Sequence, residues 1–409
     1  MRLIFRFVPL VLVLSTLTPT SAHANTATPG YGTSADADWR QNGGDQGRSG
    51  HQALTGTLTA ATAKALRATW SAPATRTGEQ IGGAVVVDGT VFRSAGGPSG
   101  QIRRYDAATG DDLGPLVDEP GQAFGELAAT GDTLVVESIQ RPELRRTLRA
   151  YRRDGARAWT AELPDAVSGG FTVAGDIIVR GAGATLTAYR TADGGVAWSA
   201  QLAGEPGFHA PVRLGDLVLI ATEPGNLQAF DARTGAPAWR RDVSGAEVVA
   251  AGDTVYTVGA GGVCAYAAAE GTQRWCDAQT LESPVHASAG DGALFVVDGH
   301  GGLAAFDAAS GAGRWHTTYG LHAEVDASYW APVNGGGAVY AMVYHFAVRG
   351  GVSTHRVELV AADARTGELI RRLDLDVDAM HGDEPLILAG DHLYFAAVQQ
   401  LHALGIKRP

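Results

Sequence analysis

A short motif recurs along this chain at intervals of roughly 40 residues, and it constrains the fold more than any other feature. Its clearest copy, GNLQAFDARTGAPAW at Gly225–Trp239, predicts a β-strand, a tight turn and a second strand that ends in tryptophan. The glycine after Thr234 suits a turn position with positive φ. Further copies lie at Gln101–Leu113, Thr147–Trp159, Thr185–Trp198, Gly262–Trp275, Gly302–Trp315 and Glu358–Leu373.

An apolar segment, broken by Gly-Asp or a related pair, precedes each hairpin and predicts a strand, a two-residue turn and a second strand. These segments lie at Val85–Phe92, Ala128–Val136, Thr172–Val179, Arg213–Ile220, Val248–Val258, Ala287–Val297, Ala331–Val343 and Leu386–Ala396. The full repeat is therefore four short antiparallel strands over roughly 40 residues, which is the size of a propeller blade.

The apolar segments outnumber the hairpins by one, and the N-terminal part of the chain can supply the missing strand. Ala65–Pro73 carries Trp70 where a repeat tryptophan would fall. Pairing this strand with the last segment closes the ring and removes both exposed sheet edges. We therefore predict an all-β fold: an eight-bladed β-propeller of four-stranded antiparallel blades, closed by an N-terminal strand. The outer strands are expected to end in Trp70, Leu113, Trp159, Trp198, Trp239, Trp275, Trp315 and Leu373.

The pattern AxDAxTGxxxW resembles the repeats of the pyrroloquinoline-quinone-like (quinoprotein-type) β-propellers, whose tryptophans dock between neighbouring blades. The resemblance extends from about Asp38 to Ile406, and DWRQNGGDQGRSG at Asp38–Gly50 looks like the lead-in of that family. It implies structural docking roles for Trp70, Trp159, Trp198, Trp239, Trp275 and Trp315. It says less about activity, because one fold hosts many functions.

The first 24 residues have the pattern of a signal peptide. Arg2 and Arg6 precede the apolar run Phe7–Leu17, and Ala22-His23-Ala24 is a small-x-small cleavage site. A membrane anchor is the alternative, but the run is shorter than the ~20 residues that a spanning helix needs. The absence of a nearby cysteine argues against a lipoprotein. We expect cleavage near Ala24, a secreted or otherwise extracytoplasmic product, a flexible leader over 25–50 and one propeller domain over 51–409.

Both cysteines of the chain flank one predicted hairpin turn. Folding about Glu270 places Cys264 and Cys276 opposite or nearly opposite each other on adjacent strands. An exported protein meets oxidising conditions, which favour a bridge. Free buried thiols and a metal pair are the alternatives, but no Cys/His spacing supports a zinc site. We predict a disulfide that acts as a staple.

The formal net charge of −11 limits the partners of the chain. It favours solubility and argues against nucleic acid, which requires a basic stripe. After the predicted signal peptide, no segment is apolar enough to span a membrane. We expect a monomer that binds a protein or a cell-envelope polymer.

Two segments depart from the repeat and are expected to form long loops. Tyr344–Glu358 is much longer than the matching turns, and Ser138–Arg149 contains four arginines. Long loops on a rigid scaffold often carry binding residues. The alternative for each is surface variation without function. The arginines are Arg141, Arg145, Arg146 and Arg149.

One face of the predicted ring collects aromatic and ionisable residues. The connections between blades and the second turn of each blade share this face, around the mouth of the channel, and such a concave site is the default ligand site. Connector residues include Gln80, Phe124–Glu126, Gly169–Phe171, Glu247, Asp383 and Glu384. The predicted ligand- or partner-binding residues are Phe208, His209, His286, His300, Tyr329 and Trp330. Each of them, taken alone, could instead be structural or merely solvated.

The sequence favours a non-catalytic member of the resembled family. Quinoprotein dehydrogenases are similar in fold and hold a quinone and Ca²⁺ at the mouth, but their adjacent cysteine pair is missing here. No GxSxG, HExxH or Walker motif is present. We assign no catalytic, metal-binding or cofactor-binding residue and expect no cofactor.

The resemblance is better to the outer-membrane barrel-assembly propeller lipoprotein and to extracellular propeller sensors. We therefore predict an exported scaffold that binds a protein or polymeric ligand without a bound quinone. Two alternatives stay open: a quinoprotein-type dehydrogenase that oxidises an alcohol or sugar, and an extracytoplasmic sensor module.

Overall fold

The computed structural model describes residues 38–73, 80–96, 100–165, 169–207, 209–223, 225–243, 247–281, 283–319, 325–327, 330–349, 352–375, 386–397 and 400–406. All of them belong to one compact unit, Gly32–Pro409. The predicted signal peptide and residues 25–37 of the expected leader lie outside this set. The described part is almost entirely β-strand, with a short 3-10 helix η1 at Ala63–Ala65. It contains no helix long and apolar enough to cross a membrane.

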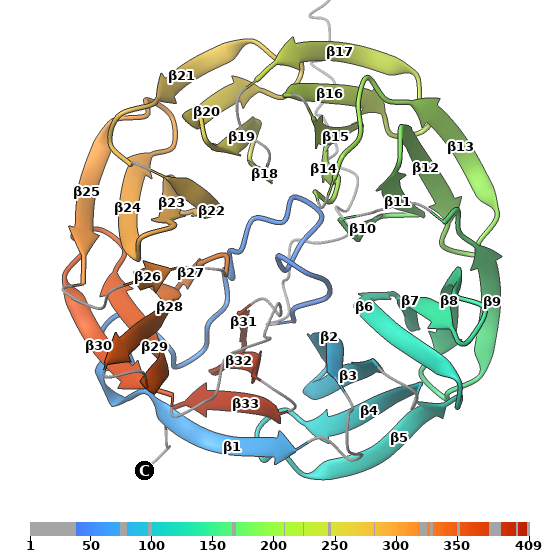
Figure 1. The fold of residues 1–409 in the computed structure, drawn as a ribbon, viewed down its shortest axis with the longest axis horizontal. Coiled ribbons are helices and arrows are strands. Elements are labelled where there is room, and N and C mark those ends of the chain that lie inside the picture. The colour runs from blue at the N-terminus through green and yellow to red at the C-terminus, as the bar shows by residue number, and fades with distance from the viewer. Residues whose placement is uncertain are drawn as a thin grey trace, which may run out of the picture. The chain divides into compact units, whose positions relative to one another are not determined.

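The strands form eight sheets around a ring, and the first four blades follow the chain directly (Figure 1). Blade 1 contains β2 (Gln80–Val87), β3 (Thr90–Gly96), β4 (Gln101–Asp106) and β5 (Asp112–Asp118). Blade 2 contains β6 (Gln122–Thr130), β7 (Thr133–Gln140), β8 (Arg145–Arg152) and β9 (Arg157–Glu162). Blade 3 contains β10 (Phe171–Ala174), β11 (Ile177–Ala182), β12 (Thr185–Arg190) and β13 (Val196–Gln201). Blade 4 contains β14 (Val212–Leu214), β15 (Leu217–Thr222), β16 (Asn226–Asp231) and β17 (Pro237–Asp242).

The second half of the ring repeats this order until the last blade. Blade 5 contains β18 (Glu247–Ala251), β19 (Thr254–Gly259), β20 (Gly262–Ala267) and β21 (Gln273–Asp277). Blade 6 contains β22 (Pro284–Gly290), β23 (Ala293–Asp298), β24 (Gly302–Asp307) and β25 (Gly313–Thr318). Blade 7 contains β26 (Val325–Ala327), β27 (Val333–Gly335), β28 (Ala338–Arg349), β29 (Val352–Asp363) and β30 (Leu369–Asp374). Blade 8 contains β31 (Ile387–Ala389), β32 (His392–Ala397), β33 (Gln400–Gly405) and β1 (Arg67–Pro73).

This topology confirms the predicted eight-bladed, antiparallel, all-β propeller. Blade 7 alone departs from four strands among the described residues, because β26 and β27 both pair with β28. The inner strands are apolar on both faces, as in β15, since each blade packs against two neighbours. The outer strands alternate or are largely exposed, as in β17.

The ring is closed by β1, as predicted. β1 pairs with β33 in antiparallel register, with Trp70 opposite Ala403 and one residue skipped after Ala68. The covalent hairpin of blade 4 has the same irregularity beside the Trp239–Ala229 pair. The N-terminal strand therefore reproduces the local geometry of a hairpin strand without a covalent turn.

Each repeat tryptophan contacts the third turn of the next blade through its indole N–H. The Trp198 indole N–H donates to the Ala232 carbonyl at 2.9 Å. Its ring lies over Gly235, where an added Cβ would approach the ring to 2.6 Å. The same donor–acceptor arrangement joins Trp70 to Ala107, Trp159 to Thr191, Trp239 to Ala268, Trp275 to Ala308 and Trp315 to Ala364.

The structure corrects the expectation that leucines replace tryptophan in blades 1 and 7. Gly114 pairs with Arg104, and Arg371 pairs with Ala361, at the positions where other blades have tryptophan. Leu113 lies in the strand irregularity and is 48% exposed. In blade 7 the change has a physical reason. Blade 8 is closed by β1 and has no third turn on which a tryptophan could dock.

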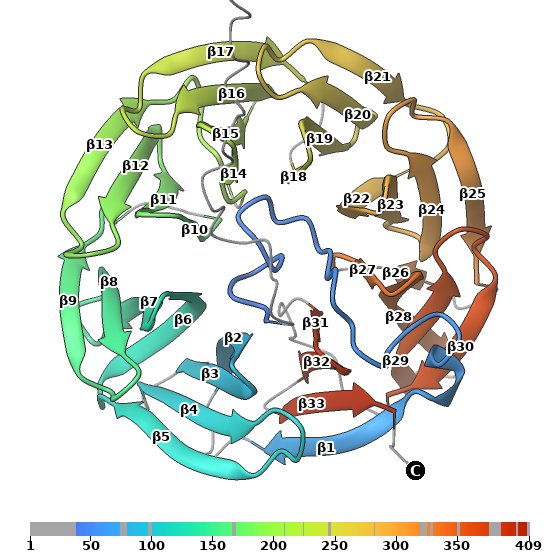
Figure 2. The ribbon, with the colours of Figure 1, turned by 180° about the vertical axis from the view of Figure 1, so that it is seen from behind.

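The second half of the predicted leader, residues 38–50, together with Gln52 runs round the inside of the ring and bonds to successive blades. Figures 1 and 2 both show it, in blue, near the centre. Its backbone or side-chain amides bond to Val86, Ala129, Val173, Arg213, Ala250, Ala289, Asn334 and Leu388, one on the innermost strand of each blade in turn. Trp39 is 1% exposed. The expectation of a flexible leader over 25–50 therefore does not hold for residues 38–50, because these inner strands offer unpaired backbone groups that the segment satisfies.

The predicted disulfide is present. Cys264 and Cys276 are directly paired residues of β20 and β21, and their sulfurs are bonded. Cys276 immediately follows Trp275, so the bond also fixes the strand that docks blade 5 on blade 6.

We expect both cysteines to be oxidised in the exported protein. Closing so short a loop should add roughly 3 kcal/mol to the free energy of unfolding by the chain-entropy estimate. Thiol labelling of denatured protein should give no label before reduction and two labels after it. Two labels without reductant would contradict the staple.

Candidate functional site

The face that carries the blade connectors bears two hairpins that project beyond the others. β7 and β8 form eight residue pairs and β28 and β29 form twelve, against six for β11 and β12. At about 3.4 Å per residue, the tips project about 7 Å and about 20 Å further. The two segments expected to be loops are therefore extended β-hairpins. Their residues continue the antiparallel pairing of β7 with β8 and of β28 with β29.

The structure describes four of the six predicted binding residues. Phe208 and Tyr329 lie outside the described residues. His300 is exposed on the β23–β24 turn, where its backbone N–H donates to Asp298 at 2.9 Å. Trp330 is only 5% exposed and packs in a cluster with Trp39 and Val333. Its ring surface is used inside the fold.

His286 contacts Glu247, a connector residue outside the predicted binding set, and His209 lies near enough for the charges of both to act on it. His209 precedes β14, Glu247 begins β18 and His286 lies in β22, so three consecutive blades contribute. His286 Nδ1 is hydrogen-bonded to Glu247 Oε2. The alternating strand pattern could not identify this pair, because the contact joins different blades.

Burial lowers the pKa of His209 below its ordinary value. The carboxylates of Glu247 and Glu223 oppose this shift, whereas the nearby His286 adds to it. The unfolded chain therefore binds a proton more readily than the folded chain does. The contribution of His209 to stability is present above about pH 6.5 and is lost as the pH falls through its folded pKa.

We expect acidification to lower the melting temperature less in His209→Gln than in the unsubstituted protein between about pH 7 and about pH 5. The control is His300→Gln, since His300 is exposed on the same face. Melting curves across this range provide the measurement. Parallel curves for all three proteins would contradict the assignment.

Other carboxylates near the mouth are held by partners within the fold. Glu126 Oε1 lies 3.5 Å from Arg48 Nη1, and Glu126 Oε2 accepts the Phe171 N–H at 3.0 Å. Burial raises the pKa of Glu126 even though the Arg48 charge acts in the opposite direction. Glu137 pairs with Arg146 and with the buried Arg180. These contacts tie the inner segment and adjacent blades together.

The carboxylates that the structure describes near the mouth do not fit a calcium–quinone site. Calcium requires several converging oxygen ligands, but Glu126, Glu137 and Glu247 each face a different cationic or histidine partner. No group of three or more His, Cys, Asp or Glu side chains that could hold a metal ion occurs among the described residues. The two cysteines lie opposite each other on a hairpin and not next to each other in the sequence.

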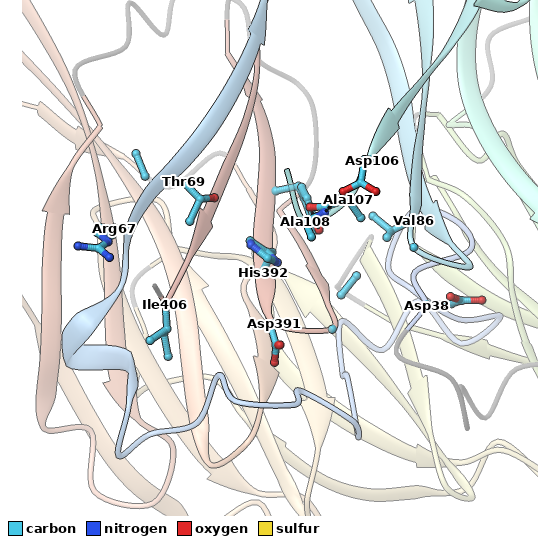
Figure 3. Close-up of a pocket in the computed structure, with 15 residues that line it drawn as sticks. Asp38, Arg67, Thr69, Val86, Asp106, Ala107, Ala108, Asp391, His392 and Ile406 are labelled. Atoms are coloured by element: carbon cyan, nitrogen blue, oxygen red, sulfur yellow. Dashed lines mark hydrogen bonds between the residues drawn. The ribbon is translucent and has the colours of Figure 1, made fainter. Parts of the chain in front are cut away.

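A cleft of about 940 Å³ lies on the opposite face, between blades 8 and 1 (Figure 3). Asp391 and His392 line one side and Asp106 and Asp38 the other. The carboxylates serve the fold: Asp38 binds Arg40 at 2.6 Å, Asp391 accepts the Thr57 hydroxyl at 3.0 Å, and Asp106 closes its own turn. No sequence pattern predicted this cleft, which arises where the ring closes.

Comparison with known proteins agrees with this architecture. A family model described as outer membrane protein assembly factor BamB matches residues 144–282 and 204–407, which together span more than half of the chain. BamB from Moraxella catarrhalis is similar in structure, with a TM-score of 0.60 at 17% identity over 83% of this chain and 99% of its own. No curated protein matches by sequence.

Two other solved structures share the fold alone. Quinohemoprotein alcohol dehydrogenase ADHIIG from Pseudomonas putida HK5 has a TM-score of 0.65 at 12% identity, over 91% of this chain and 82% of its own. The C-terminal WD40 domain of Sif2 has a TM-score of 0.66 at 12% identity, over 84% of this chain and 99% of its own. The family model, and not the likeness in fold, identifies the family. The chain belongs to the β-propeller family whose model is described as outer membrane protein assembly factor BamB.

Proposed function

We propose that this protein is an exported, non-catalytic scaffold that binds a protein partner through its connector face. The observation that carries the proposal is the difference between the two faces of the ring. The connector face bears two overhanging hairpins and the His209–Glu247–His286 cluster. The opposite face consists largely of similar small turns.

Those small turns are already committed to the fold. In blade 4, the Asp231 side chain accepts the Thr234 N–H and hydroxyl and so closes its own turn. The next residue, Ala232, receives the Trp198 indole N–H, and Gly235 lies under the ring. A partner that bound these turns would compete with the contacts that hold neighbouring blades together. The two overhanging hairpins of the connector face extend beyond the blades, so a partner can bind them without this cost.

Family membership supports the choice of a protein ligand in the cell envelope. The family model is described as an outer membrane assembly factor, and the disulfide suits an oxidising compartment. Together with the signal-peptide pattern of residues 1–24, this favours an extracytoplasmic location. A cell-envelope polymer is the other ligand that the connector face could take.

The test uses the purified mature protein and its partner, obtained from the producing cells by reversible cross-linking. We expect the double variant His209→Ala/His286→Ala to weaken binding about tenfold, since residues that converge in the centre of an interface dominate its energy. Arg233→Ala is the control, on an exposed turn of the opposite face. Melting curves must show that both variants fold. If Arg233→Ala abolishes binding and the histidine variant binds normally, the partner uses the opposite face.

A further inference from the structure

We propose that the tip of the blade 2 hairpin, Arg141–Arg145, is a protein contact that inserts Leu144 into an apolar pocket with an acidic rim. This inference rests on the proposed function and specifies the chemistry of the partner. The tip lies on the connector face at the end of the β7–β8 ladder, whose last pair is Gln140 and Arg145. Its arginines belong to the cluster that the sequence places in Ser138–Arg149, and the fold leaves them at the surface.

The tip is an exposed knob on a rigid support. All five residues from Arg141 to Arg145 are exposed. Directly below them, Thr147 and Leu148 are buried, so the ladder that carries the tip is part of the blade. A contact presented by such a ladder loses little conformational freedom when a partner binds.

No contact within the described part of the fold explains why a leucine stands at position 144. It is 61% exposed, the highest fraction among the exposed large apolar residues of the described chain. Its φ is +59°, in the left-handed region that disfavours residues with a Cβ. An isolated exposed leucine is common. Leu144, however, has an unfavourable backbone conformation, and no burial of its side chain within the ring offsets that cost. Burial against a partner would supply that compensation.

The charges around Leu144 define the partner. Arg145 pairs with Glu162 at 2.6 Å, but both side chains are more than half exposed, so water screens the pair. The Arg141 side chain forms no ion pair with the described residues. A partner with carboxylates beside its apolar pocket can therefore engage both guanidinium groups.

The same chemistry could suit an anionic membrane, but the charge of the whole chain favours a protein. A lipid surface attracts several basic residues over a broad area, whereas the net charge of this chain is −11. Arg146 is also occupied, by Glu137 at 3.4 Å. One apolar side chain with two available arginines matches a discrete pocket better than a membrane surface.

The first experiment places a photoreactive amino acid at position 144 of the full chain in the producing cells. Val196, which is 55% exposed on the outer strand β13, is the control position. We expect a discrete cross-linked protein from position 144 only. That protein is then purified and its affinity measured for the unsubstituted chain, Leu144→Ala, Arg141→Glu, Arg141→Lys and Val196→Ala.

Leu144→Ala and Arg141→Glu should each weaken binding at least tenfold, while Arg141→Lys and Val196→Ala stay within about twofold. Melting temperatures should be unchanged by Arg141→Glu, because its side chain forms no ion pair within the described fold. Equal affinity of all variants would overturn this inference and leave the proposed function standing. The same photoreactive amino acid is also placed at His300, which is exposed on the same face. Absence of any cross-linked protein from both position 144 and position 300 would contradict both this inference and the proposed function. Sedimentation with phosphatidylglycerol vesicles that Arg141→Glu abolishes would assign the tip to a membrane and overturn the protein contact.

Discussion

Deleting Ala65–Ala72 is expected to open the ring and cause aggregation. The deletion removes nearly all of β1, the strand that pairs with β33. It also removes Trp70, whose indole N–H donates to the Ala107 carbonyl of blade 1 at 3.2 Å. Without these contacts blade 8 presents an unpaired apolar edge, which is a predicted aggregation site. Soluble yield and light scattering after purification provide the measurement.

The matched control for closure is the deletion of Asn25–Thr33, which precedes the segment bound inside the ring. We expect that variant to be soluble and to melt like the full mature chain. Trp70→Ala is an intermediate case, since it removes the docking contact and keeps the strand. Equal solubility and melting for both deletions would mean that blade 8 closes without β1.

Trp198→Ala is expected to lower the free energy of unfolding by roughly 3–5 kcal/mol, the range for truncating a large buried aromatic residue. Trp198 is 7% exposed and packs with Ile220 and Phe230 of the next blade. The substitution also leaves the Ala232 carbonyl without the indole donor. Chemical denaturation monitored by circular dichroism measures the loss. A change below about 1 kcal/mol would show that the blades stay docked without this ring.

Alanine substitutions at two glycines can distinguish the cost of disturbing the tryptophan contact from the cost of backbone strain alone. Gly235 and Gly114 both have positive φ, of +72° and +82°. An added Cβ at Gly235 would approach the Trp198 ring to 2.6 Å, whereas at Gly114 it would meet nothing within 4 Å. Alanine at Gly114 should cost about 1–2 kcal/mol, from the backbone alone. Alanine at Gly235 should cost distinctly more, and equal costs would argue against a tight ring contact.

The sequence repeat carries enough information to predict the architecture. The spacing of Asp231, Gly235 and Trp239 gives a strand, a turn with positive φ and a docking residue, and these are local properties of the chain. Counting the repeats then requires a strand at Trp70 to complete the eighth blade. The Cys264–Cys276 bond follows in the same way, because both residues belong to one hairpin.

Contacts between blades could not be predicted, because no local pattern encodes them. Glu247 and His286 are 39 residues apart, and they meet only because the ring places the starts of blades 5 and 6 side by side. Trp330 shows the opposite case. Its position in a connector suggested exposure, but it is buried in the core cluster that also contains Trp39.

Alone, the sequence determined the class of fold, the number of blades, the closing strand and the staple, since each follows from repetition over short distances. The tertiary structure decided the rest. Residues 38–50 have the composition of a loose leader, and only the unpaired inner strands of a closed ring hold them in place. Leu144 likewise became a candidate contact because the ladder below it extends two pairs beyond that of blade 3 and leaves the side chain in solvent.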